Sequence, residues 1–175
     1  MLTAGLPVSF KGAAVVMGVA SCGKTTLGEA LAAQLHLPFV EGDKLHGEAN
    51  VAKMSSGIAL TDEDRWPWLA RVGTALQGHT GVIASCSALK KAYRLAIAAS
   101  ANRPVCFIHL HGEEALLAAR IAARKGHFMP ASLLATQFAT LEMPDASENH
   151  ITIDVALPPD EQLAQTMNYL NAGIR

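Results

Sequence analysis

The sequence predicts an α/β protein in which helices cover both faces of a five-stranded parallel sheet. Five short apolar runs alternate with longer segments of helical periodicity, which is the pattern of repeated strand–helix–strand units. The chain has 175 residues, half of them hydrophobic, so one core can bury enough surface without disulfides or a structural metal. We therefore expect one domain over residues 1–175.

The five expected strands are short runs of mostly apolar residues between longer segments. Continuous apolar runs are typical of strands that are buried on both faces, as in parallel sheets. The expected strands cover residues 13–17, 38–41, 81–86, 105–110 and 151–155.

The expected helices are the segments between these runs. Leu27, Leu31 and Leu35 recur at helical spacing, and Thr61 followed by three acids is typical of a helix start. Alanine-rich stretches and prolines near first turns support the others. The expected helices cover residues 24–36, 62–77, 88–101, 113–125, 130–142 and 160–171.

Composition and charge exclude several classes of function. Fourteen Lys and Arg against fifteen Asp and Glu leave a net charge of −1, which argues against a broad nucleic-acid-binding surface. No apolar stretch approaches the length of about 18 residues that spans a membrane. Three cysteines at irregular spacing predict neither a disulfide framework nor a zinc site, so we expect a reducing, cytoplasmic location.

The strongest functional motif lies between the first strand and the first helix. Residues 18–25 read GVASCGKT, which fits the phosphate-binding pattern G-x-x-x-x-G-K-[ST]. Glycines let the backbone curl so that successive N–H groups point at phosphate oxygens, and the helix N-terminus adds positive potential. The alternative is a glycine-rich turn that matches by chance, but strand, loop and helix occur in the required order. The expected nucleotide contacts are Gly18, Ala20, Ser21, Cys22, Gly23, Lys24, Thr25 and Thr26.

Three of these side chains carry specific expectations. Lys24 would reach the β- and γ-phosphates of ATP, and the Thr25 hydroxyl would bind Mg²⁺. Cys22 lies beside the helix N-terminus, which would lower the pKa of its thiol, although its side chain is expected to point away from the phosphates.

Asp43 follows the second strand, at the edge of the sheet where α/β proteins bind ligands. A carboxylate there could deprotonate an acceptor hydroxyl or hold a Mg²⁺-bound water, and both roles suit phosphoryl transfer to an alcohol. The alternative is that Asp43 only caps the helix that follows it.

A basic cluster follows the third strand, where Lys90, Lys91 and Arg94 lie at a helix start. Cations are unfavourable in a first helical turn, so the cluster predicts an anion to be met there. The alternative is a solvated charged face.

Arg120 and Arg124 lie four residues apart in the segment that ends at Gly126. Arginines on a mobile lid can stabilise the transferring phosphoryl group while closure excludes water. The alternative is that they only interact with the negative end of their own helix.

Taken together, these residues resemble the gluconokinase family, P-loop kinases that phosphorylate D-gluconate at its 6-hydroxyl with ATP. The resemblance covers nearly the whole chain. It rests on residues 17–19, 41–46, 50–54, Gly57, Leu60, 62–65, 68–69, 86–91, 93–94, 124–128, 137–138 and 141–142.

The resemblance implies a P-loop, nucleoside-monophosphate-kinase-like three-layer fold with a five-stranded parallel sheet, helices on both faces and a helical lid. It implies a helical substrate-binding region at 44–80 and a lid at 120–143. It also implies that Asp43 faces the acceptor hydroxyl, that His46, Lys90 and Arg94 hold gluconate, and that Arg120 and Arg124 close over ATP. Lys24, Asp43 and Arg124 would then be the catalytic residues, with Mg²⁺ as cofactor and a homodimer as the expected assembly.

Two other functions fit part of the pattern. A shikimate kinase would share the fold and the loop but carries Asp-x-Asp after the second strand, where this chain has Gly42-Asp43. An NTP-hydrolysing regulatory module is the alternative from another class. The basic cluster and the arginines at 120 and 124 favour a transferase, which binds an anionic acceptor and excludes water.

Overall fold

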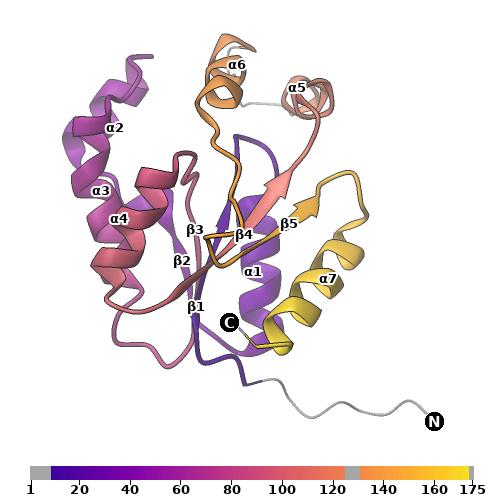
Figure 1. Cartoon of the computed structure of the whole chain (residues 1–175). Helices are drawn as coiled ribbons and strands as arrows, with labels where there is room; N and C mark the ends of the chain where they lie inside the picture. Colours follow the sequence, from indigo (N-terminus) through magenta and orange to yellow (C-terminus); the bar gives the residue numbers. More distant parts are fainter. Residues whose placement is uncertain (1–8, 125–130, 174–175) are drawn as a thin grey trace.

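The computed structural model describes residues 9–124 and 131–173, and its centre is a parallel sheet in the order β2-β3-β1-β4-β5 (Figure 1). The expected five-stranded parallel sheet is confirmed, and strand ends differ from the expected ones by one residue. The strands are β1 (Ala13–Met17), β2 (Phe39–Glu41), β3 (Val82–Ser85), β4 (Val105–His111) and β5 (His150–Asp154).

The six expected helices are present in the described part of the chain. The residue patterns did not predict the helix α2 or the short 3-10 helix η1. α2 lies within the region at 44–80 that the resemblance implied to be helical, and η1 begins just before that region. The helices are α1 (Lys24–Leu35), η1 (Gly42–Leu45), α2 (Glu48–Ser55), α3 (Asp62–Ala75), α4 (Lys91–Ala101), α5 (Glu114–Ala123), α6 (Ala131–Thr140) and α7 (Pro159–Asn171).

The sheet separates two hydrophobic cores, which gives three layers (Figure 1). Because alternate residues of a strand point to opposite faces, Ala14 and Val16 join the core under α1 and α7. Ala13 and Val15 join the core under α3 and α4. All five residues of β1 are buried, which explains why the strand is apolar throughout.

The carboxyl ends of the strands meet at one edge of the sheet, beside α2, α5 and α6 in Figure 1. Register places Val16 beside Ser85 and Met17 beside His109. Strand order reverses next to β1, because β1 lies between β3 and β4. A crevice outside such a reversal is where open α/β sheets bind ligands.

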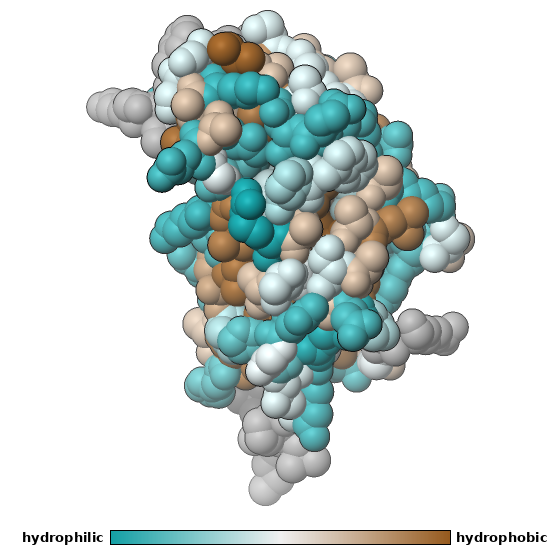
Figure 2. Space-filling model, turned by 90° about the vertical axis from the view of Figure 1, so that its left-hand side faces the viewer, coloured by the Kyte–Doolittle hydropathy of each residue, from teal (hydrophilic) through white to brown (hydrophobic). Residues whose placement is uncertain are grey.

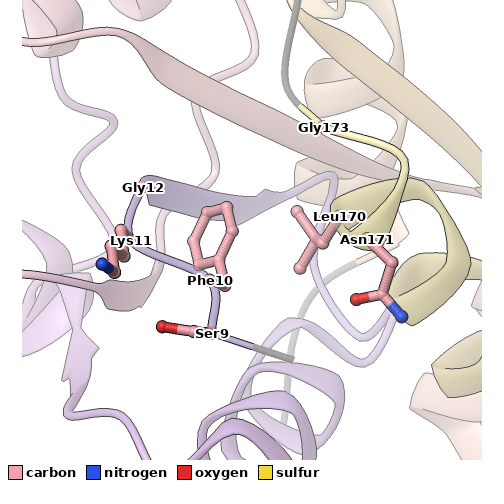
Figure 3. Close-up of a pocket in the computed structure, with 7 residues that line it drawn as sticks. All are labelled: Ser9, Phe10, Lys11, Gly12, Leu170, Asn171 and Gly173. Carbon is pink, nitrogen blue, oxygen red and sulfur yellow. The ribbon is translucent and has the colours of Figure 1, made fainter. Parts of the chain in front are cut away.

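A surface hollow lies at the opposite end of the sheet, where β1 begins and α7 ends (Figure 3). Its lining includes Phe10 and Leu170, whose side chains point toward one another. This hollow is remote from the phosphate-binding motif. Within residues 9–124 and 131–173, no helix is long and apolar enough to cross a membrane.

Candidate active site

The loop between β1 and α1 has the backbone conformation that phosphate binding requires. Gly18, Ser21 and Gly23 all have positive φ angles, and Gly18 N–H donates to the Ser87 carbonyl oxygen at 3.2 Å. A Cβ atom on Gly18 would lie 2.7 Å from the Leu110 carbonyl oxygen, so only glycine fits. The helix α1 begins at Lys24, as expected, and its first N–H groups face the loop.

Lys24 and Cys22 behave differently within this loop. The Lys24 ammonium group donates to the Val19 carbonyl oxygen at 3.0 Å, which folds the side chain back over the loop. Cys22 is 1% exposed and packs in the core, so its side chain does point away from a ligand. The expected lowering of its pKa is wrong, because burial raises the pKa of the Cys22 thiol more than Lys24 lowers it. Cys22 can therefore contribute only its backbone to a nucleotide.

Glu41, which the sequence reasoning missed, joins two strands to the loop. It ends β2, and its carboxylate accepts hydrogen bonds from Thr25 Oγ1 at 2.6 Å and from the Ser85 hydroxyl. The signal was present in the sequence, because Glu41 lies two residues before Asp43. Glu41-Gly42-Asp43 is itself a carboxylate-x-carboxylate pattern, with glutamate where the Asp-x-Asp of shikimate kinases has its first aspartate.

Thr25 and Glu41 provide oxygen atoms that suit Mg²⁺. Mg²⁺ prefers oxygen ligands and keeps several waters, so one hydroxyl and a nearby carboxylate are a sufficient protein contribution. Their oxygen atoms lie 2.6 Å apart beside the phosphate loop. No group of three or more His, Cys, Asp and Glu residues forms a dedicated metal site in the part of the chain that the structure describes.

Asp43 lies on the short helix η1 and is exposed. The alternative that it caps the following helix is wrong, because Gly47 is the N-cap residue of α2. The turn is held by Trp68, whose indole nitrogen donates to the Gly42 carbonyl oxygen at 2.8 Å. A Cβ on Gly42 would lie 2.1 Å from the Ser85 carbonyl oxygen, so glycine lets the turn press against β3. The carboxylate of Asp43 has no hydrogen-bond partner among the described residues.

Three charged groups converge near the end of β3. Burial raises the pKa of the Cys86 thiol to about 12, and the charges of Asp43, Lys24 and Glu41 all act on that thiol. Asp43 lies two residues after Glu41, whose carboxylate bonds Thr25 of the phosphate-binding motif, and the glycine between them presses against β3. The expected acceptor-binding carboxylate therefore lies near the phosphate loop.

His46 lies beside Asp43, stacked on the Trp68 ring with 4.0 Å between centroids. Burial lowers the pKa of His46, while Asp43 raises it and Arg65 and Arg71 lower it. His46 is therefore a neutral ring between one anion and two cations.

Arg65 is a second residue that the sequence reasoning missed. Its guanidinium lies 5.7 Å from the centroid of the Tyr93 ring, and Lys90 Nζ lies 5.4 Å from the same ring. It therefore lies between His46 and the start of α4. An arginine one turn into an acid-rich helix start was the available signal.

The lysines of the basic cluster form ion pairs with carboxylates of the protein itself. Lys90 Nζ pairs with Asp62 at 3.0 Å, and Lys91 Nζ pairs with Asp145 at 2.8 Å. The Lys91 backbone N–H, in the first turn of α4, donates to the Glu142 carboxylate at 2.7 Å. A carboxylate at this helix start explains how the turn tolerates its cations.

Arg94 is a correction to the expected gluconate contacts. Its side chain is 1% exposed and forms a bidentate pair with Glu148, at 2.5 Å from Nε and 3.1 Å from Nη2. Its Nη1 donates to the carbonyl oxygens of Ala88 and Leu89. Burial raises the pKa of Glu148, but the hydrogen bonds from Arg94 and from the Asp145 backbone, together with the Arg94 charge, lower it below its usual value. Arg94 therefore anchors the loop before α4 and is inaccessible to a substrate.

Arg120 and Arg124 reach outside their own helix. Arg120 Nη2 donates to the Val155 carbonyl oxygen at 2.7 Å, and Arg124 Nη1 lies 3.4 Å from Ser21 Oγ in the phosphate loop. Neither contact is with the end of α5, and the Arg124 contact with the phosphate loop favours a role at the nucleotide. Residues 125–130, inside the expected lid at 120–143, lie outside the described residues.

The face that carries α2, α3 and α4 is mixed in character. Figure 2 shows hydrophilic side chains with hydrophobic ones scattered among them. The exposed apolar side chains of these helices are Val51, Met54, Trp66 and Leu95.

The fold and the site together define a P-loop kinase of a small molecule, and comparison with known proteins agrees. A family model described as "AAA domain" matches residues 14–144. The chain is 45% identical over 163 residues to a gluconokinase of Gluconobacter oxydans, covering 90% of each chain. A crystal structure of a gluconokinase from Sinorhizobium meliloti 1021 matches with a TM-score of 0.85 at 48% identity over 92% of each chain.

The chain belongs to the gluconokinase family. A crystal structure of shikimate kinase from Aquifex aeolicus matches with a TM-score of 0.58, over 91% of this chain and 96% of that one. Because that identity is 12%, the likeness shows a shared fold alone. The shikimate kinase alternative is therefore not favoured.

Proposed function

We propose that this protein phosphorylates D-gluconate with ATP, forming 6-phospho-D-gluconate and ADP. One observation supports the proposal beyond family membership: an exposed carboxylate, Asp43, follows two residues after Glu41, which bonds Thr25 of the phosphate-binding motif. A phosphoryl acceptor bound at Asp43 would lie next to the end of the nucleotide.

The nucleotide side supplies positive charge. Backbone N–H groups of the loop and the start of α1 bind the β- and γ-phosphates, and Lys24 leaves the Val19 carbonyl oxygen to reach them. Arg124, beside Ser21, neutralises charge on the γ-phosphoryl group as it is transferred. Arg120 stays near the loop and contributes to the same potential.

The acceptor side supplies a base and binding groups. The 6-hydroxyl oxygen of gluconate attacks the γ-phosphorus while Asp43 accepts the proton of that hydroxyl. The bond between the γ-phosphorus and the β–γ bridging oxygen breaks, and ADP leaves. Lys90 and Arg65 provide cations for the gluconate carboxylate, and His46 provides a neutral ring beside the chain of hydroxyls.

Mg²⁺ bound together with ATP would supply positive charge at the phosphates. Thr25 would hold the ion through its hydroxyl, and Glu41 would accept hydrogen bonds from its waters or bind it directly.

A coupled assay of ADP release tests the proposal with four acceptor classes: gluconate, other aldonates, shikimate and nucleoside monophosphates. We expect turnover with gluconate well above every other acceptor and above ATP hydrolysis without acceptor. Turnover of another acceptor with none on gluconate rejects the assignment. ATP hydrolysis that no acceptor stimulates would instead support the regulatory module.

Asp43→Asn tests the base. It keeps the shape of the side chain but cannot accept the proton, so kcat should fall on the order of 10²- to 10⁴-fold. ATP affinity, measured by titration calorimetry, should stay within about twofold because Asp43 has no hydrogen bond to the described part of the phosphate loop. A variant with full activity removes Asp43 from the base role.

A further inference from the structure

One side chain of α6 contacts the phosphate loop. Gln137 Oε1 accepts a hydrogen bond from the Ala20 N–H at 2.6 Å, across 117 residues of sequence. Loop N–H groups are what phosphate oxygens bind, and here a carboxamide oxygen occupies one of them.

The packing of α6 holds Gln137 in this position. Leu134 is 1% exposed and joins the main core, and Phe138 and Leu141 pack against the same core. Gln137 lies between them on that side of the helix, one turn after Leu134. After α6, Glu142 N–H donates to the Leu89 carbonyl oxygen at 2.8 Å, which fixes the end of the segment.

The hydrogen bond to Ala20 also orients the rest of the carboxamide. A glutamine side chain accepts through Oε1 and donates through both hydrogens of Nε2. Because Oε1 is held by Ala20, the amide cannot flip without losing that bond. Nε2 has no acceptor among residues 9–124 and 131–173, so both of its hydrogens can bind a ligand.

The ligand chemistry follows from the neighbouring contact. Arg124 lies beside Ser21, the residue after Ala20, so Gln137 and Arg124 contact consecutive residues of the loop. A phosphate group bound at this part of the loop would have both the Arg124 guanidinium and the Gln137 Nε2 group nearby.

We propose that Gln137 is a catalytic residue whose Nε2 group binds the γ-phosphoryl group of ATP, while Ala20 holds its Oε1 atom. This role rests on the proposed kinase function. Donors that are preorganised toward a group whose charge is redistributed in the transition state stabilise that state without reorganisation. The residue would act on the transferring group and not on the phosphates that ADP retains.

Gln137→Glu separates binding of the phosphoryl group from anchoring of α6. Glutamate has the same length and still accepts from Ala20 N–H, but it replaces the two Nε2 donors with an anionic oxygen. A second variant, Gln137→Met, keeps the length and removes both functions. Thermal unfolding of each variant reports whether α6 remains docked.

The readout is the affinity ratio between the β,γ-imido analogue of ATP and ADP, both with Mg²⁺, measured by titration calorimetry. Gln137→Glu should lower this ratio by about 10-fold or more, because hydrogen bonds to charged groups are the stronger ones. Affinity for ADP should stay within about twofold. Gln137→Met should also lower the ratio, and kcat with gluconate should fall in both variants.

An unchanged affinity ratio and kcat in Gln137→Glu would overturn the proposal and leave Gln137 as an anchor. Equal losses for ADP and the analogue would also overturn it, since the γ-phosphoryl group would not be involved. If the wild-type protein does not phosphorylate gluconate, the proposed function fails, but the affinity ratio still tests Gln137 as a γ-phosphoryl ligand.

Discussion

The cations of the active site fall into two groups that differ in what they already bind. On the nucleotide side, the hydrogen bonds of Lys24, Arg120 and Arg124 to residues 9–124 and 131–173 go only to neutral oxygen atoms: two carbonyls and a hydroxyl. Across the sheet, three cations at the start of α4 each pair with a carboxylate. The cations in this second group are Lys90, Lys91 and Arg94.

This difference shows which cations are ready for an anionic ligand. A cation that gains a phosphate in place of a carbonyl oxygen gains an opposite charge at close range, which is strongly favourable in a partly dehydrated cleft. A cation that is already paired must first give up its own carboxylate. A basic residue is therefore a weaker indication of a ligand site where the fold gives it an acidic partner.

The largest expected effect is that of Lys24→Met, which removes an unpaired cation from the phosphate loop. Its kcat/KM in the ADP-release assay should fall on the order of 10²- to 10³-fold, as when other preorganised electrostatic donors are removed. Lys11→Met is a matched control, since Lys11 lies by the remote hollow (Figure 3). A loss below about tenfold would mean that Lys24 does not differ from the paired cations.

Glu148→Gln removes the partner of Arg94, which is the most buried of the paired cations. It leaves Arg94 without its counter-charge at 1% exposure, which should reduce the free energy of unfolding by about 3–5 kcal/mol. Asp145→Asn is the control, because its pair with Lys91 is exposed to solvent and should contribute much less to the free energy of unfolding. Denaturant titration measures both, and equal effects would show that burial does not distinguish the pairs.

The stability that the Arg94–Glu148 pair contributes should depend on pH. The pKa of Glu148 lies below its ordinary value of 4.5, so the stabilisation is complete above pH 4.5 and is lost as pH falls through the lowered pKa. The stability difference between wild type and Glu148→Gln should shrink over that range. A difference that grows on acidification would contradict the assignment.

The smallest expected effect is that of Lys90→Met on substrate binding. Lys90 and Asp62 are both partly exposed, so a gluconate carboxylate can replace Asp62 as the partner of Lys90. The KM for gluconate should rise about 10-fold or more, with kcat changed less. Lys91→Met, whose partner Asp145 lies 54 residues away, should stay within about twofold of wild type.

The fold and the phosphate loop could be predicted because their signals are local. The apolar run of β1, the glycines at 18 and 23 and the helix start at Lys24 are consecutive, and each follows from backbone geometry. Gly18 needs its positive φ angle whatever the rest of the chain does.

The roles of the basic residues could not be predicted in the same way. Arg94 reads as a surface cation at a helix start, but its partner Glu148 lies 54 residues away. Nothing local distinguishes it from Lys90, whose partner is 28 residues away in the other direction. Pairing is a property of the assembled sheet and helices, so sequence spacing alone could not separate an anchor from a substrate ligand.

The two bonds of Glu142 to the start of α4 have a mechanical consequence. One bond runs from Glu142 N–H to Leu89 and the other from Lys91 N–H to the Glu142 carboxylate, so they run in opposite directions. Such a pair resists twisting as well as separation, and it makes the end of α6 a fixed pivot. Any movement of α6 would then be a rotation about this point, which lies next to Lys90, the proposed acceptor ligand at the N-cap of α4.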